Sequence, residues 1–285
     1  MNRVAEARET TVVIPAFNEA EGIGATIDGL KAQGFAEIIV VDDGSTDDTS
    51  ARAMARGARV VRHPYNKGNG AAVKTGIREV RSRVILLMDA DTQHNPEEAM
   101  KLVEPIGTYD MVIGARSLND QSLLRAAGNA VFRGLAGWLT GRPIPDLTSG
   151  FRAATRQALI DVIHVLPNGF SYPTTSCLAL MKSGQSVSFV PILARPRVGT
   201  SKIRPLQDGF TFILIIFKIV TLYAPLRVFA PIALTSFLGG IGYGIWNVAR
   251  FGKIPMGSAL LIQLGVVVFL FGLISEQIAS MQDRR

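Results

Sequence analysis

Residues 84–93 read Val-Ile-Leu-Leu-Met-Asp-Ala-Asp-Thr-Gln, a five-residue apolar run followed at once by two carboxylates. An apolar run of this length bounded by polar residues is typical of a strand buried in a sheet. Asp89 and Asp91 then follow the strand, and Gln93 adds a carbonyl oxygen two residues further on. Oxygen ligands favour Mg²⁺ or Mn²⁺ over zinc. Two aspartates after a strand are also ordinary turn residues, so the motif by itself is a weak indication of a metal site.

The same strand-and-turn pattern extends on both sides of this stretch. Further strand candidates are residues 11–15, 37–41, 59–62 and 111–114. Helical patterns lie between them at residues 20–33, 48–56, 70–80 and 96–106. Asn95 and Pro96 suit the N-cap and first position of the last helix. This alternation predicts an α/β domain with a mostly parallel sheet flanked by helices on both faces, whose ligands bind at the carboxyl ends of the strands.

The net charge of +7 is confined to the C-terminal third of the 285 residues. Residues 1–194 hold 20 basic and 20 acidic side chains, whereas residues 195–285 hold ten basic and three acidic ones. Basic residues beside apolar segments favour anionic lipid as a partner and argue against nucleic acid, which would need the charge on the folded domain. The single cysteine, Cys177, excludes a disulfide framework and a cysteine-based zinc site.

Two charge-free runs near the C-terminus, residues 228–249 and 254–275, are separated by a short basic loop from Arg250 to Lys253. Each run is long enough to cross a bilayer of roughly 30 Å. We therefore predict three parts: a catalytic domain over residues 1–205, an interfacial amphipathic segment over 206–227 and a transmembrane helical hairpin over 228–281. The alternative is a pair of buried helices in a soluble core.

The termini of this hairpin are expected on one side of the membrane. Residues 1–10 are polar and do not resemble a signal peptide. Six basic residues between positions 195 and 227 precede the hairpin and two follow it, against two in its loop. By the positive-inside rule, the catalytic domain and both termini are expected in the cytoplasm. Four glycines would allow the hairpin to pack closely against itself or against a neighbour in a homo-oligomer: Gly239, Gly240, Gly242 and Gly244.

Other polar stretches also follow predicted strands. Residues 40–47 read Val-Val-Asp-Asp-Gly-Ser-Thr-Asp, and their carboxylate pair is well placed to bond a ribose hydroxyl or a base edge. Thr46 or Asp47 can instead cap the following helix. Residues 66–70, Asn-Lys-Gly-Asn-Gly, open a helix whose backbone N–H groups could approach a phosphate, although they match neither a Walker A loop nor a Rossmann fingerprint. The three histidines form no triad spacing. His94 follows the predicted metal loop and could support its ligands from behind, but a surface or helix-start role is expected for it.

Six motifs in one order carry a family resemblance. They are residues 13–19 (Val-Ile-Pro-Ala-Phe-Asn-Glu), 41–45 (Val-Asp-Asp-Gly-Ser), 67–70 (Lys-Gly-Asn-Gly), 88–94 (Met-Asp-Ala-Asp-Thr-Gln-His), 114–116 (Gly-Ala-Arg) and 146–152 (Asp-Leu-Thr-Ser-Gly-Phe-Arg). Together they resemble the dolichyl-phosphate mannose synthase branch of glycosyltransferase family 2, over residues 11 to about 205. The resemblance implies a GT-A fold and transfer with inversion of the anomeric centre. The QxxRW signature of processive synthases is absent, which argues against a polymerase.

The resemblance also implies roles for individual residues. Those expected in the nucleotide site are Pro15, Phe17, Glu19, Asp43, Lys67, Asp89 and Ala90. Those expected to hold a divalent metal with the diphosphate are Asp89, Asp91 and Gln93. Those expected to face phosphate groups, including that of the acceptor, are Arg116, Arg125, Arg197 and Lys202. Asp146 matches a residue near the reacting sugar. Asp89, Asp91, Arg116 and Asp146 thus form the expected catalytic set.

The expected reaction is transfer of a sugar from GDP-mannose or a UDP-hexose to dolichyl or undecaprenyl phosphate. Because the acceptor phosphate is an anion near neutral pH, it can attack without a general base, so Asp146 is not required in that role. The catalytic demand is then to neutralise charge on the leaving diphosphate. Alternatives are another lipid acceptor such as diacylglycerol, a non-catalytic nucleotide-sugar-binding membrane scaffold, and a nucleotidyltransferase, which the lack of a glycine-rich nucleotidyl loop disfavours. The identities of the sugar and the base stay open.

Overall fold

The computed structural model describes residues 5–116, 134, 137–138, 141–169, 171–193 and 225–282. The chain divides into two compact units, Met1–Ile203 and Arg204–Arg285. Most of the predicted interfacial segment, residues 206–224, lies outside the described residues, and so do Arg125, Arg197 and Lys202. The predictions for these residues therefore stay predictions.

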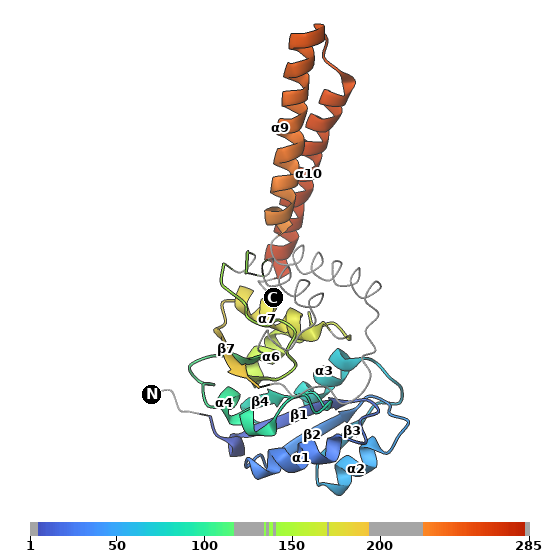
Figure 1. Cartoon of the computed structure of the whole chain (residues 1–285), viewed down its shortest axis with the longest axis vertical. Helices are drawn as coiled ribbons and strands as arrows, with labels where there is room; N and C mark the ends of the chain where they lie inside the picture. Colours follow the sequence, from blue (N-terminus) through green and yellow to red (C-terminus); the bar gives the residue numbers. More distant parts are fainter. Residues whose placement is uncertain are drawn as a thin grey trace. The chain divides into compact units, whose positions relative to one another are not determined.

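The described strands of the first unit form one seven-stranded sheet with the order β3-β2-β1-β4-β6-β5-β7 (Figure 1). Their bounds are β1 Thr10–Ala16, β2 Glu37–Asp42, β3 Arg59–Arg62, β4 Val84–Leu87, β5 Met111–Arg116, β6 Arg152–Thr155 and β7 Val187–Ile192. The five predicted strands are confirmed, and the pairs among β1 to β4 and between β5 and β7 are parallel. Strands β6 and β7 were not predicted from the sequence.

Strand β6 runs antiparallel between β4 and β5. Arg152, its first residue, lies opposite Leu87 in β4 and opposite Ile113 in β5. The chain just before β6 therefore meets the carboxyl ends of both neighbours, where Asp89 and Arg116 are found. One reversed strand thus brings residues 146–151 to the edge of the sheet that carries the polar loops.

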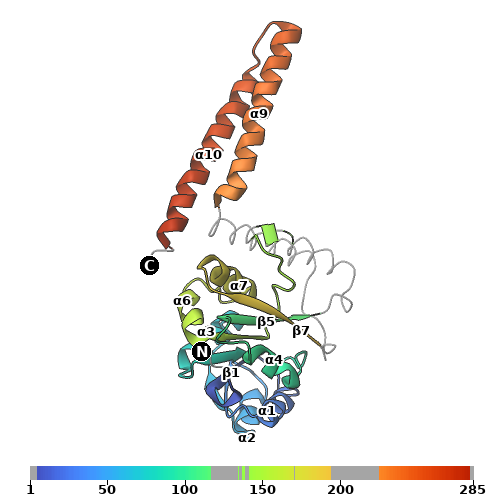
Figure 2. The same ribbon diagram turned by 90° about the vertical axis from the view of Figure 1, so that its left-hand side faces the viewer.

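Helices cover both faces of the sheet (Figures 1 and 2). One face carries α1 Ile23–Ala32, α2 Thr49–Ala55, the 3₁₀ turn η2 Pro96–Glu98 and α4 Ala99–Val103. The other carries α3 Asn69–Glu79, α6 Arg156–Val162 and α7 Tyr172–Lys182, and a short turn, η1 Ala7–Glu9, precedes β1. Side chains alternate along β1, so Val12 and Ile14 join the buried cluster of α1. Val13 faces α3, where Gly76 leaves the strand just enough room.

The helix predicted over residues 96–106 is shorter than expected. It consists of η2 followed by α4, and it ends at Val103. Its predicted start is confirmed, because the Asn95 side chain accepts a hydrogen bond of 3.3 Å from the Glu97 N–H and Pro96 follows directly.

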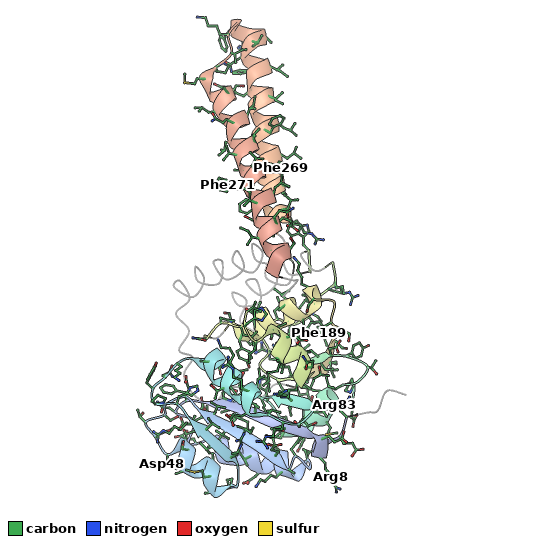
Figure 3. All side chains as sticks on the ribbon, turned by 180° about the vertical axis from the view of Figure 1, so that it is seen from behind. Arg8, Asp48, Arg83, Phe189, Phe269 and Phe271 are labelled. Carbon is green, nitrogen blue, oxygen red and sulfur yellow. The ribbon has the colours of Figure 1, made fainter. Side chains whose placement is uncertain are left out.

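The second unit is a hairpin of two long apolar helices, α9 Pro225–Phe251 and α10 Met256–Gln282. Both are long and apolar enough to cross a membrane. Helix α9 contains the predicted charge-free run 228–249, and α10 begins two residues after the start of the run 254–275. Large apolar side chains stand on the outside of the helices, for example Phe269 at 43% and Phe271 at 60% exposure (Figure 3). Helices of a soluble core would bury these faces, so this exposure favours a membrane hairpin.

Small residues line the contact between α9 and α10. The Ser258 hydroxyl donates to the Gly240 carbonyl oxygen at 2.7 Å, and Gly244 leaves room for the same serine. A Cβ at Gly240 would lie 2.9 Å from Ile262, whereas Gly239 and Gly242 have nothing within 4 Å. Two of the four glycines therefore serve packing inside the hairpin, as small residues commonly do in membranes.

Candidate active site

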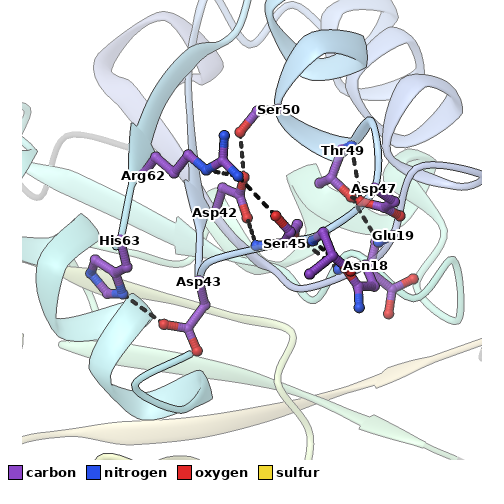
Figure 4. Close-up of polar contacts among 11 residues, drawn as sticks. Asn18, Glu19, Asp42, Asp43, Ser45, Asp47, Thr49, Ser50, Arg62 and His63 are labelled. Carbon is purple, nitrogen blue, oxygen red and sulfur yellow. Dashed lines mark hydrogen bonds and ion pairs between the residues drawn. The ribbon is translucent and has the colours of Figure 1, made fainter. Parts of the chain in front are cut away.

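The first two loops at the carboxyl edge of the sheet are bonded to each other (Figure 4). The Asn18 N–H donates to Ser45 Oγ at 3.0 Å, and Asn18 Oδ1 accepts from the Thr46 N–H at 2.9 Å. The Glu19 N–H donates to Thr49 Oγ1 at 2.9 Å. The segment that contains the predicted nucleotide residues Phe17 and Glu19 is thereby fixed beside the loop that follows β2, and Pro15 lies in β1 opposite Val41.

Asp42 and Asp47 both form hydrogen bonds within the segment between β2 and α2. Asp42 is fully buried and accepts hydrogen bonds from the Ser45 N–H at 2.8 Å and from the Ser50 hydroxyl. Asp47 accepts from the N–H of Thr49, the first residue of α2, at 3.0 Å, although the N-cap position itself is Asp48. Burial acts to raise the pKa of Asp47, but its hydrogen bonds from Thr49 and Ala20 outweigh burial and lower that pKa. Both side chains stabilise the loop itself.

Asp43 is the centre of a buried hydrogen-bond network. Its Oδ1 lies 2.6 Å from His63 Nδ1 and accepts from the Lys67 N–H, while its Oδ2 accepts from the Gly68 N–H at 2.8 Å. His63 Nε2 is 2.9 Å from Thr75 Oγ1. His63 was not predicted as a site residue, although the pairing of β3 with β2 places it beside Asp43. Asp43 thus ties the carboxyl end of β2 to the start of α3, next to the nucleotide site that the sequence predicts.

The glycines at the start of α3 have a packing role. A Cβ at Gly70 would overlap with the Pro167 carbonyl oxygen, and one at Gly68 would overlap with that of Asn168. The Ala71 N–H donates to Asn168 O at 3.0 Å, so residues of the same chain occupy this helix N-terminus. The glycines are therefore explained without a phosphate. Lys67 extends over the ring of Tyr65, 5.7 Å from its centroid.

Replacing Gly70 by alanine should destabilise the catalytic unit by about 1–3 kcal/mol, the usual cost of overpacking. Alanine is the better helix former, so a gain would be expected if the space were free. A thermal unfolding experiment should show a lower melting temperature for Gly70→Ala. The matched control is Gly169→Ala, because nothing lies within 4 Å of a Cβ at Gly169. Equal melting temperatures for the two variants would contradict the packing role.

The loop after β4 holds the predicted metal ligands. Asp89 is partly exposed, at 28%, and Asp91 Oδ1 accepts from the Gln93 N–H at 3.2 Å. The Asp89 carboxylate lies against Gly150, where a Cβ would overlap with Oδ2. No cluster of three His, Cys, Asp or Glu side chains is found in the described part of the chain, so a metal here would have two carboxylates and an amide as protein ligands. Such an oxygen-only ligand set fits Mg²⁺ or Mn²⁺ completed by diphosphate or water.

Arg116 at the end of β5 forms a two-pronged ion pair with Asp146. Arg116 Nε is 2.8 Å from Asp146 Oδ2, and Nη2 is 3.2 Å from Oδ1. Nη2 also donates to the Thr148 hydroxyl at 2.6 Å. Burial opposes both charges, yet the hydrogen bond between the partners raises the pKa of Arg116 and lowers that of Asp146. The pair therefore stays charged, and Asp146 serves to hold Arg116.

His94 is buried beside the metal loop, so the surface role expected for it is wrong. Its side chain is 3% exposed and stacks on Phe151, with ring centroids 5.0 Å apart. Burial lowers the pKa of His94 to about 4, and the imidazole is neutral at physiological pH. Its Nε2 lies 3.9 Å from Asp89 Oδ2, and Nδ1 has no hydrogen-bond partner among the described residues. Phe151 directly precedes the reversed strand β6, whose pairing the sequence pattern could not show.

Two family models match the chain in separate regions. Residues 11–163 match glycosyl transferase family 2, and residues 224–281 match the GtrB C-terminal hairpin. The first match spans the sheet from β1 to β6 with all described loops of the site, and the second spans α9 and α10.

Three relatives extend this similarity. Glycosyltransferase AglJ of Haloferax volcanii is 29% identical over 285 residues, which cover 95% of this chain and 93% of the relative. The dolichyl-phosphate hexose transferase of the same organism is 31% identical, over 70% of this chain and 89% of the relative. The undecaprenyl-phosphate mannosyltransferase of Micrococcus luteus is 30% identical, over 67% of this chain and 85% of the relative.

Solved structures resemble the first unit in fold. Glucosyl-3-phosphoglycerate synthase of Mycobacterium tuberculosis, crystallised with Mn²⁺, UDP-glucose and phosphoglyceric acid, superposes with a TM-score of 0.60. It is 24% identical and covers 74% of this chain and 79% of its own. At this identity the likeness concerns the fold alone, and the mixed sheet is of the GT-A type.

Proposed function

Because the chain belongs to glycosyl transferase family 2, we propose that it transfers a sugar from a nucleotide-diphosphate sugar to a polyprenyl phosphate, with inversion of the anomeric centre. One observation carries this proposal. The carboxylates of Asp89 and Asp91 and the Arg116–Asp146 pair gather at one edge of the sheet, in a chain that ends in an apolar hairpin. The relatives named for dolichyl and undecaprenyl phosphate support the same acceptor class.

The donor nucleotide is proposed to bind across the first loops of the sheet. The residues proposed to line its site are Pro15, Phe17, Glu19, Asp43, Lys67, Asp89 and Ala90. The hydrogen bonds between the β1–α1 and β2–α2 loops support this assignment, because they present the two loops as one rigid surface. Asp43 acts mainly by holding the start of α3, since both of its oxygens already accept hydrogen bonds.

Asp89, Asp91 and Gln93 are proposed to hold a Mg²⁺ or Mn²⁺ ion together with the donor diphosphate. A divalent cation in this position supplies positive charge to the departing nucleotide diphosphate. The oxygen-only ligand set supports this choice. So does the Mn²⁺ found in the structurally similar synthase.

The acceptor needs no protein base, because a phosphate monoester is already an anion near pH 7. The structure offers no ready base among the described residues near Asp89. Asp146 is paired with Arg116, and His94 is buried with a lowered pKa. The task left to Arg116 is to reduce repulsion between the anionic nucleophile and the anionic leaving group. At the acceptor phosphate, the same reduction of charge repulsion is proposed for Arg125, Arg197 and Lys202.

The hairpin is proposed to anchor the enzyme where its acceptor resides. An isoprenoid tail stays in the bilayer, so the catalytic domain, residues 1–205, must work at the membrane surface. Residues 206–227 would lie in the interface, with roughly 1 kcal/mol of attraction to anionic lipid for each basic side chain. Residues 228–281 would span the membrane, with both termini in the cytoplasm.

An acceptor assay tests the function. Detergent-solubilised protein is incubated with radiolabelled UDP- or GDP-sugars, Mn²⁺ or Mg²⁺, and either undecaprenyl phosphate, dolichyl phosphate or diacylglycerol. We expect butanol-extractable label with a polyprenyl phosphate and not with diacylglycerol. Label only with diacylglycerol would support the other lipid acceptor. Donor binding without label from any donor and acceptor would support the non-catalytic scaffold.

A further inference from the structure

Arg152, the first residue of β6, is a completely buried cation. No described carboxylate forms an ion pair with Arg152. The guanidinium instead donates to three acceptors: Ser149 O from Nε at 3.1 Å and also from Nη2, Pro173 O from Nη1 at 2.7 Å, and Ser176 Oγ from Nη1 at 2.8 Å. Four of the five N–H groups of the side chain are thus used.

These hydrogen bonds fasten one loop to one helix. Two of them hold the carbonyl of Ser149, in the loop before β6, and the other two hold the first turn of α7. The Thr174 hydroxyl, which donates to Leu147 O at 3.3 Å, joins the same two segments. Burying an unpaired charge is costly, and an apolar side chain would fill the space at lower cost. We therefore infer that Arg152 fixes the position of the loop before β6.

The loop that Arg152 holds is the one that touches Asp89. Gly150 follows Ser149 directly and lies against the Asp89 carboxylate. Arg152 also stands opposite Leu87 in β4, two residues before Asp89. Burial lowers the pKa of Arg152, against smaller opposing effects of Tyr172, Cys177, Asp146 and Asp89.

We propose that Arg152 is a positioning residue of the metal site, which fixes Asp89 for the cation by clamping the Ser149–Gly150 backbone between β6 and α7. The inference rests on the proposed function, in which Asp89 is a metal ligand. It adds that the affinity for the cation depends on a guanidinium that never touches the cation. Supporting groups behind a metal ligand commonly contribute 10- to 100-fold in metal affinity, at order-of-magnitude precision.

The decisive variant is Arg152→Lys, measured with Mn²⁺ alone by electron paramagnetic resonance of the free ion. Lysine keeps the charge, but a single ammonium cannot reproduce the planar fork that reaches Ser149 O and Pro173 O together. We expect about 10- to 100-fold weaker Mn²⁺ binding at a temperature at which the variant is folded. Gly70→Ala is the matched control, because it should lower thermal stability and leave Mn²⁺ affinity unchanged. Equal weakening in both variants would mean that Arg152 acts only through stability.

The outcomes separate this proposal from the proposed function. Wild-type protein that binds Mn²⁺, with Arg152→Lys binding it equally well, overturns the role of Arg152 alone. Wild-type protein that fails to bind Mn²⁺ overturns the metal assignment and this inference with it. Should Arg152→Lys not fold, Ser176→Ala keeps the arginine and removes one of its acceptors. It should weaken Mn²⁺ binding about two- to fivefold, and unchanged affinity would again reject the proposal.

Discussion

Replacing Asp91 by asparagine is expected to lower the rate of sugar transfer by about 10²–10³-fold, the usual effect of removing one charge-stabilising group from a transfer site. Asparagine has the size of aspartate and keeps one side-chain oxygen. That oxygen can still accept the hydrogen bond that the Gln93 N–H donates to Asp91 Oδ1 at 3.2 Å in the wild-type protein. The variant therefore changes charge with little change in loop geometry. Initial rates at saturating donor and acceptor, over a range of Mn²⁺ concentrations, measure the effect.

The control for this experiment is Asp48→Asn, the same chemical change at an exposed carboxylate in the loop after β2 (Figure 3). The Asp48 side chain makes no capping hydrogen bond to α2. The sugar-transfer rate of Asp48→Asn should therefore stay within about twofold of the wild-type rate, as for an ordinary surface substitution. Wild-type turnover of Asp91→Asn at every Mn²⁺ concentration would show that Asp91 is not a metal ligand, even if the enzyme activity is as proposed.

The sequence predicts the buried strand and the loop with Asp89 and Asp91 because its signals are local. The apolar run before Asp89 forms a buried strand, and the two aspartates follow it within the same ten residues. Asn95 and Pro96 likewise mark the start of a helix by side-chain chemistry alone. The two hairpin helices are predictable for a similar reason, since charge-free length depends only on composition.

Strand β6 was not predictable in this way. Its four residues, Arg-Ala-Ala-Thr, include only one β-branched side chain, Thr155, and no aromatic one, so they give little indication of a strand. It is a strand because β4 and β5 pair with it from both sides. The roles of Arg152 and of the buried His94 follow from that pairing, and so does the meeting of Arg116 with Asp146. The part of the site around β6 therefore depends on tertiary strand pairing, which no local sequence pattern encodes.

Gly150→Ala is the second substitution with a large expected effect, about a 10²-fold loss of transfer rate, because misplacing a catalytic group by about 1 Å has that consequence. The backbone at Gly150 does not have a positive φ, so alanine is conformationally allowed there. The new Cβ would, however, overlap with Asp89 Oδ2. The carboxylate must then move, and Mn²⁺ binding should weaken together with the rate, which the same resonance titration measures.

Gly169→Ala is again the matched control, because a Cβ at Gly169 meets open space. Since alanine is allowed at position 150, Gly150→Ala should lose only the stability that overpacking by one methyl group costs, about 1–3 kcal/mol. A thermal unfolding experiment measures this loss. A large loss of rate with a small loss of stability then assigns the effect to Asp89. If Gly150→Ala retains both the rate and the Mn²⁺ affinity of wild type, the carboxylate does not act in the position that the structure gives it, and the bare face of Gly150 serves packing alone.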